Sequence, residues 1–221
     1  MHQPKLGPTE RVYLQLKNDI TLQNFSFNER LVVNELAERY TVSTTPVREA
    51  LSRLHGEDLI NFRYGHGYFC KTPTLRELRE LYELLTVIVA SSLKKCNVSG
   101  SDARHVRELA SMVAGQLENN DDKRQWVVHL TEEVVLVGGN QISLNLVKNI
   151  HARTYFISKR AFIDDCSSTD LIRIVDHLQQ SIRSHDLRSQ ESDLLNYHDV
   201  MRNSLPTLLV NHVGAQYIAQ A

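Results

Sequence analysis

The sequence has few of the features that mark disulfide-rich, metal-binding or membrane-spanning proteins. Its three cysteines, Cys70, Cys96 and Cys166, are odd in number, far apart and free of Cys-x-x-Cys spacing. We interpret them as reduced packing residues without a zinc or redox role. No apolar run reaches the ~18 residues that a membrane span needs, and the N-terminus lacks the apolar core of a signal peptide. These absences predict a cytoplasmic protein.

Glycine and proline are also scarce, and neither sign of charge dominates. The 221 residues include 9 Gly and 5 Pro, with 42% hydrophobic and 23% charged residues, a composition typical of a helix-rich globular protein. The net charge of -1 does not indicate a nucleic-acid partner, so such a partner has to be argued from individual basic residues. We find no nucleophile elbow, phosphate-binding loop or dinucleotide-binding motif, and therefore expect no enzyme.

The N-terminal part shows a pattern of short helices. Apolar residues at helical spacing predict a helix over 9–23, capped by the Thr9 side chain, and a short second helix over 32–40. A tight turn follows. Pro46 has no amide hydrogen and fits only the first turn of a helix, so a third helix is expected to begin near residue 44.

After the third helix the pattern becomes extended. The segments LINFRY and YFCK flank Gly65-His66-Gly67, and glycine permits the positive φ of a tight hairpin turn. We therefore predict a small β-wing that completes a first domain, residues 1–73, with Thr74 capping the next helix. The second domain, residues 74–221, is predicted to be an all-α bundle with helices at about 75–96, 102–118, 121–138, 140–160, 170–182 and 188–212. The fold class is therefore mainly α, with an N-terminal winged helix-turn-helix.

Two short helices and a hairpin can present the later helix end-on to a major groove of DNA, while the hairpin reaches the neighbouring backbone or minor groove. Ser43, Thr44 and Thr45 would offer hydroxyl groups and free amides to phosphate oxygens. Arg48, one turn later, can bind guanine O6 and N7. Lesser candidates, each equally readable as a solvated surface residue, are Asn34, Arg39 and Arg63.

The string ERLVVNELAERYTVSTTPVREALSRLHGEDLINFRYGHGYF resembles the winged helix-turn-helix of the GntR family, especially its FadR-like branch, over about residues 10–70. The resemblance implies a DNA-binding regulator. Thr44 stands where the FadR-like pattern usually has arginine, and His66 precedes Gly67 where a basic residue is common near the wing tip. Base recognition is therefore expected to depend on Arg48, with His66 and Gly67 at the wing.

The region 75–212 is more faintly similar to the all-helical FCD domain of this branch, through TLRELRELYELL, GGN and IVDHLQQSIRSHD. Many such domains bind a divalent metal through one aspartate and three histidines, and the metal holds a carboxylate effector. Leu85 stands where many relatives have an arginine. The four family metal positions fall on Val127, Thr131, Val175 and Asn196. These are not a metal-ligand set, so we expect no metal or other cofactor.

We predict that an effector would contact those four positions and Arg153. Arg153 would face inward and pair with an acidic ligand, although an internal ion pair or a dimer contact explains it equally well. The expected partners are double-stranded operator DNA, a small-molecule effector and a second copy of the chain, because two half-sites require a two-fold dimer. We expect a repressor, although the residues do not separate repression from activation. In the alternative, the helical domain only dimerises.

Overall fold

The computed structural model describes residues 6–98, 119–138, 140–163, 165–184 and 186–219. The chain divides into two compact units, residues 1–73 and 74–221. The helix predicted over 102–118 lies outside the described residues. Among the residues that are described, no helix is long and apolar enough to span a membrane.

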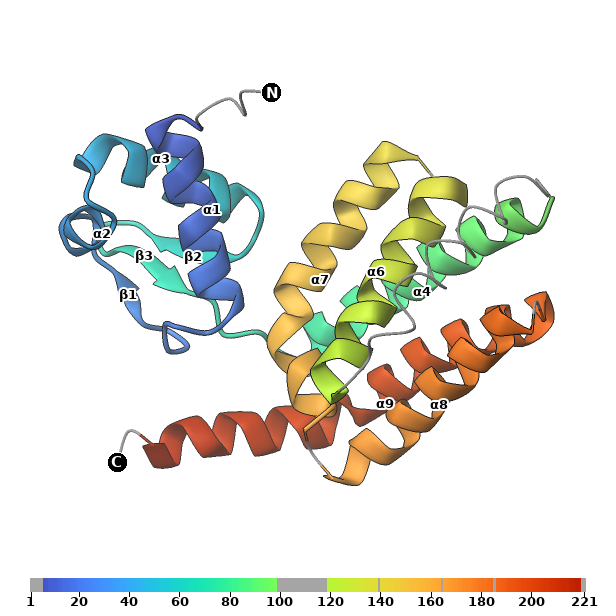
Figure 1. The fold of residues 1–221 in the computed structure, drawn as a ribbon. Coiled ribbons are helices and arrows are strands. Elements are labelled where there is room, and N and C mark those ends of the chain that lie inside the picture. Colours follow the sequence, from blue (N-terminus) through green and yellow to red (C-terminus); the bar gives the residue numbers. More distant parts are fainter. Residues whose placement is uncertain (1–5, 99–118, 139, 164, 185, 220–221) are drawn as a thin grey trace. The chain divides into compact units, whose positions relative to one another are not determined.

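The first unit contains three helices and a small antiparallel sheet (Figure 1). Its elements are α1 (Pro8–Thr21), β1 (Arg30–Leu31), α2 (Val33–Tyr40), α3 (Thr44–Gly56), β2 (Ile60–Arg63) and β3 (Gly67–Cys70). The sheet order is β1-β3-β2, and Ile60 pairs with Cys70 in the β2–β3 hairpin. Gly65 and Gly67 have φ of 75° and 93°, which confirms the glycine turn predicted for the wing.

The core of the first unit lies where α1 packs against α3. Val12 and Leu16 of α1, and Leu51 and Leu54 of α3, are 0% exposed. Burying each of these side chains stabilises the fold by about 1.5–3 kcal/mol. Because they recur every three or four residues, they fix which face of α3 points inward and which is left outside.

Two local predictions for this unit were wrong. The Thr9 side chain does not cap α1, which begins at Pro8 after an N-cap at Gly7; its hydroxyl instead donates to Glu49 Oε2 at 2.6 Å. The sheet also has a third strand that was not predicted. β1 is only two residues long and pairs with β3 through Arg30 and Leu31, which is too short for alternation to be visible.

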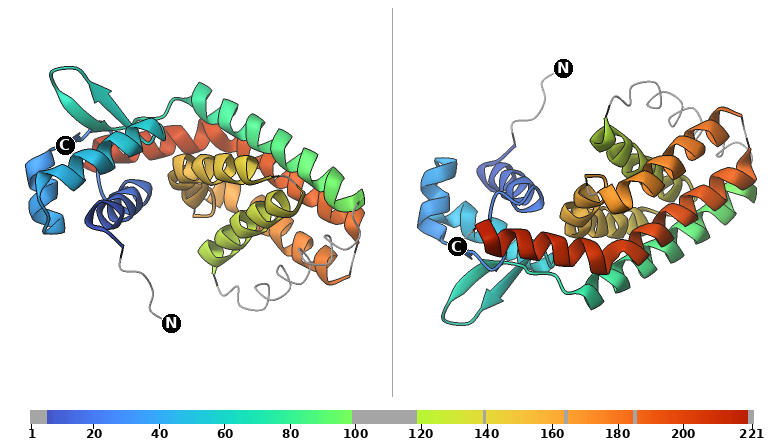
Figure 2. Two further views of the ribbon diagram at one scale, coloured as in Figure 1. Left: turned by 90° about the horizontal axis from the view of Figure 1, so that it is seen from above. Right: turned by 90° about the horizontal axis from the view of Figure 1, so that it is seen from below.

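The described part of the second unit consists of helices (Figures 1 and 2). They are α4 (Leu75–Val98), α6 (Asn120–Gly138), α7 (Gln141–Ala161), α8 (Asp165–Arg183) and α9 (Leu187–Ala219). The helix α9 lies along α4 and α8, while α6 packs against α4 and α7. Fully buried apolar side chains from α6, α7, α8 and α9 meet in the core, among them Val127, Val147, Leu171 and Met201.

Helix starts were predicted well where a side chain caps the first turn. Thr74 Oγ1 accepts a hydrogen bond from the Glu77 amide at 3.2 Å, as predicted. Asn140 accepts one from the amide of Ser143 at 2.9 Å. Asp186 caps α9 in the same way, and its hydrogen bonds with Ser189 lower the pKa of the Asp186 carboxyl.

Two helix ends in the second unit were predicted wrongly. The helix α8 begins at Asp165, before the start predicted at about residue 170. The helix α9 continues to Ala219, well past residue 212, with Pro206 inside it. Neither extension follows from the spacing of apolar residues, because the last buried side chain described in α9 is Leu208.

Gly138 marks the closest approach of α6 to α4. A Cβ atom at this position would lie 2.1 Å from the backbone oxygen of Ser92 and 2.8 Å from Cys96 Sγ. Real Cβ atoms do not come that close to backbone, so the two helices can pack here only around glycine.

The substitution Gly138→Ala should therefore destabilise the second unit by about 2–4 kcal/mol, as overpacking against backbone does. Urea unfolding followed by circular dichroism measures this loss. Gly56→Ala is the matched control, because a Cβ there would meet nothing within 4 Å. Equal effects of the two substitutions would contradict this account of the α4–α6 contact.

Candidate functional site

The first turn of α3 presents free backbone amides. Ser43 occupies the N-cap position in an extended conformation, with φ -73° and ψ 169°, and its side chain makes no capping hydrogen bond. Pro46 is buried in the first turn, as predicted from its missing amide hydrogen. Uncapped amides at a helix N-terminus attract anions. Ser43 and Thr45 are also exposed, so both hydroxyl groups lie beside these amides.

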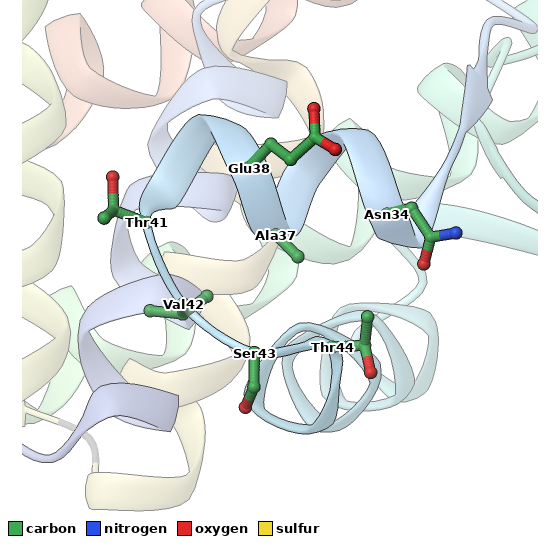
Figure 3. A pocket seen from close by; sticks show the side chains of 7 residues that line it. All are labelled: Asn34, Ala37, Glu38, Thr41, Val42, Ser43 and Thr44. Carbon is green, nitrogen blue, oxygen red and sulfur yellow. The ribbon is translucent and has the colours of Figure 1, made fainter.

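An open cleft of about 730 Å³ lies between α2 and the start of α3 (Figure 3). Asn34 from α2 and Thr44 from α3 lie on opposite walls, whereas the Ser43 side chain points away from α2. Glu38 also lines the cleft and is exposed. Its carboxylate repels phosphate, so an anion is favoured at the α3 end of the cleft rather than over α2.

Arg48 is exposed and makes no hydrogen bond or ion pair within the described part of the chain. Arg53, the other arginine of α3, has partners inside the chain. Arg53 pairs with Glu10 at 2.8 Å and its guanidinium lies 3.5 Å from the centroid of the Tyr13 ring. Arg48 therefore keeps its fork of N–H donors for a partner outside this chain.

The other two predicted arginines have intramolecular partners. Arg39 pairs with Asp19 at 3.3 Å and stacks 5.0 Å from the Phe25 centroid. Arg63 donates to Asn28 Oδ1 at 2.5 Å and lies 4.3 Å from the centroid of Phe69. These contacts occupy part of each guanidinium, and a DNA-contacting role for either residue stays a prediction.

The turn of the wing exposes the predicted His66 and one residue that was missed. His66 is exposed, and its amide closes the turn by donating to the Arg63 carbonyl at 2.9 Å. Gly67 opens β3. Tyr64, in the same turn, is 94% exposed. Its aromatic ring favoured a strand in the sequence, so the pattern gave no sign that it would stand at the tip.

Polar contacts anchor α3 to α1 beside the apolar core. Lys17 Nζ and the Tyr13 hydroxyl each donate to the Glu57 carboxylate at 2.7 Å. Burial alone would raise the pKa of Glu57, but these hydrogen bonds hold it below its usual value. With the Thr9–Glu49 bond at the other end of α3, they fix the helix that carries Arg48.

In the second unit, the residues predicted to contact an effector differ in their exposure to solvent. Val127, Thr131 and Val175 are 0% exposed, and the Thr131 hydroxyl donates to the Val127 carbonyl at 2.8 Å. Asn196 is exposed, unlike the other three, and its contact with an effector stays a prediction. The inward face of α9 runs through Leu194 and Met201, and this spacing turns residues 197 and 198 inward instead.

Arg153 forms an internal ion pair, which was one of the two alternatives to a role in binding an acidic ligand. Its guanidinium bonds to Glu77 of α4, and both side chains are largely buried. Buried arginine needs such a partner. A direct ion pair between Arg153 and an acidic ligand would therefore have to displace Glu77.

The residues present do not fit the metal site of the FCD domain. Valine and threonine side chains at three of the four positions are not ligands for such an ion, and the fourth, Asn196, faces outward. Within the described ranges, no group of three or more His, Cys, Asp or Glu side chains is arranged to hold a metal. The expectation of no metal cofactor stays a prediction.

The inward-facing polar residue on α9 is His198, which is 1% exposed. Neither of its ring nitrogens has a hydrogen-bond partner in the described structure. Burial lowers the pKa of His198 to about 3, and the nearby His151 adds to the effect. His151 itself bonds to Glu132 Oε1 through Nδ1 at 3.1 Å.

Comparison with known proteins finds a family model that matches the first unit. Residues 8–70 match the family model described as bacterial regulatory proteins, gntR family. The chain is 28% identical over 137 residues to the Nta operon transcriptional regulator of Aminobacter aminovorans, covering 60% of this chain and 65% of that one. It is 32% identical over 90 residues to the HTH-type transcriptional repressor GlaR of Escherichia coli (strain K12), covering 41% of each.

The chain thus spans less than two thirds of the length of these relatives. A Rhodococcus sp. RHA1 structure, described as a transcriptional regulator GntR, shares the fold with a TM-score of 0.71 and 16% identity, covering 90% of this chain and 97% of that one. The fold is therefore that of a GntR-like winged helix-turn-helix followed by a helical domain.

Acid should destabilise the second unit through His198. Its pKa is about 6.5 in an unfolded chain and about 3 here, so between these values the unfolded chain binds one proton more. His198 should therefore lower the free energy of unfolding by about 1.4 kcal/mol for each pH unit below about 6. Above about pH 7 it should not affect the free energy of unfolding.

Urea unfolding of the wild type and His198→Phe across this pH range isolates the effect, because the substitution removes that slope. The exposed His129 supplies the control, since His129→Phe should keep the slope of the wild type. A difference between wild type and His198→Phe that does not vary with pH would show that His198 does not carry the effect.

Proposed function

We propose that this chain is a DNA-binding transcriptional regulator of the GntR family whose helical domain responds to a small molecule. The observation that carries the DNA-binding part is Arg48. It is exposed and unpartnered one turn after an uncapped helix N-terminus, in a unit that matches the gntR family model. This combination supplies a phosphate anchor and a base-reading side chain on one rigid helix.

The α3 turn suits the major groove of duplex DNA. Its free amides, with the hydroxyls of Ser43 and Thr45, would bind phosphate oxygens and set the register of the helix. Arg48 would then donate to O6 and N7 of guanine. The wing tip, with Tyr64 and His66, would contact the neighbouring backbone or minor groove.

A second copy of the chain would supply the second half-site contact. One such head reads only a few base pairs, so specific recognition requires a two-fold dimer. Leu84 and Val87, three residues apart on α4, are 41% and 66% exposed and favour burial in such a contact. Repression is the proposed outcome, because the relative GlaR is named a repressor, and the cytoplasm, where operator DNA lies, is the proposed location.

An effector can alter operator binding only if it binds one arrangement of the two DNA-binding units better than another. The buried, unpartnered imidazole of His198 supports a ligand in the helical domain. In the second candidate function, this domain only dimerises. The Arg153–Glu77 pair and the unsuitable metal positions favour that alternative, because they leave no site for a metal-held carboxylate.

Arg48→Ala should weaken sequence-specific DNA binding without changing the stability of the protein. A duplex selected by the wild type from a random library should be bound about 5- to 150-fold more weakly, which corresponds to the loss of about 1–3 kcal/mol of discrimination. Fluorescence anisotropy at several salt concentrations measures this, and wild-type affinity should fall steeply with salt.

Arg39→Ala is the matched control. Because Arg39 is paired and stacked inside its own unit, this substitution should lower thermal stability more than it lowers DNA affinity. Wild-type affinity in the Arg48→Ala protein would show that α3 is not the reading helix.

Tyr64→Ala should weaken binding to the same duplex by about 5- to 10-fold, because an aromatic ring that is exposed in the free protein loses its contact with the DNA surface. Tyr64→Phe separates the ring from the hydroxyl. The melting temperature should not change in either variant, since the Tyr64 side chain is almost fully exposed. Undiminished affinity in Tyr64→Ala would remove the tyrosine from the proposed interface.

A further inference from the structure

The imidazole of His198 is buried at a cost in stability. It is 1% exposed, and both Nδ1 and Nε2 lack a hydrogen-bond partner in the described structure. Buried polar groups are almost always hydrogen-bonded, because an unsatisfied group loses its water without compensation. The neighbouring inward positions of α9 are apolar at Leu194, Met201 and Leu205 and aromatic at Tyr197. An apolar residue would therefore suit position 198 better if packing were its whole role.

Other polar side chains of the same interior have partners. Tyr82 of α4 hydrogen-bonds with Thr154 of α7, and both are buried. His151 of α7, close enough to influence His198, bonds to Glu132 of α6. The helices α4 and α7 that carry these groups pack against α9. These groups thus find their partners on neighbouring helices, whereas both nitrogens of His198 stay available.

The charges of this interior argue against an acidic ligand. Arg124 pairs with Asp121 at 2.8 Å, Arg153 with Glu77, and His151 with Glu132. A carboxylate that entered would need a compensating charge, and both arginines already face a carboxylate of the chain. A neutral imidazole, by contrast, offers one N–H donor and one nitrogen acceptor.

We infer that His198 hydrogen-bonds to the effector of the helical domain, and that this effector is a small uncharged molecule with both a donor and an acceptor group. The inference rests on the proposed effector response and names the chemistry of its ligand. It assigns to α9 the residue that recognises the ligand, and it needs no metal.

The first experiment measures the melting temperature of the full chain without added compounds. His198→Phe and His198→Leu should each raise it by about 2–8 °C, because they remove an unsatisfied buried group. Two variants are used so that a misfit of one side chain does not decide the result. The control substitution His129→Phe, at an exposed position, should leave the melting temperature unchanged. If both His198 variants lower the melting temperature, the imidazole is a structural residue and the inference fails.

The second experiment screens two sets of compounds by thermal shift, in the presence of EDTA. One set contains uncharged amides, polyols, phenols and nucleosides, and the other contains acetate, lactate, succinate, citrate and benzoate. A compound of the uncharged set should stabilise the wild type and change its DNA affinity, and it should have no effect on whichever His198 variant is folded. A response to carboxylates alone, or to neither set, overturns the inference.

DNA binding by the same preparation separates the two proposals. If the wild type binds its selected duplex and Arg48→Ala does not, while no uncharged compound acts, only the effector inference fails. If neither protein distinguishes the selected duplex from a scrambled one, the proposed function itself fails, whatever the screen shows.

Discussion

The packing of α1 against α3 is the contact on which the DNA-binding surface depends. Leu51 and Leu54 are buried against Val12 and Leu16, so the opposite face of α3 has to point outward. The Lys17–Glu57 and Thr9–Glu49 contacts then prevent α3 from sliding or rotating on α1. Arg48 is exposed and has no ion-pair partner among the described residues, and the adjacent Glu49 is engaged by Thr9. The packing of the core thus leaves this arginine exposed and available to a partner outside the chain.

Features set by a few adjacent residues were predictable from the sequence. Pro46 marks the start of α3, the glycines of the wing mark its turn, and Thr74 caps α4, because each acts within one turn of backbone. The same reasoning failed for Thr9, since its partner Glu49 is 40 residues away and no local pattern reveals that bond. The end of α9 was missed for a different reason, because in the described part of the chain no buried side chain beyond Leu208 marks it.

In the helical domain, the positions taken from the family pattern are not all buried. Three of the predicted effector positions are buried, but Asn196 faces outward because α9 is rotated relative to that register. A two-residue shift along a helix is about 200°, enough to exchange an inward for an outward position. The exposed Tyr64 was missed for another reason. An aromatic residue between strand-forming residues gives no sign that a turn will expose it.

Gly138 also limits how the helical domain can move. Where α6 meets the backbone of Ser92, the nearest atoms are those of the Ser92 backbone, which cannot rotate away as a flexible side chain can. The two helices therefore have to travel as one body at this point, and α4 is the helix that follows the linker from the wing. Rearrangements of α6 would be passed to the start of the domain without loss. A glycine inside the second unit would then set how tightly the movements of α6 and α4 are coupled.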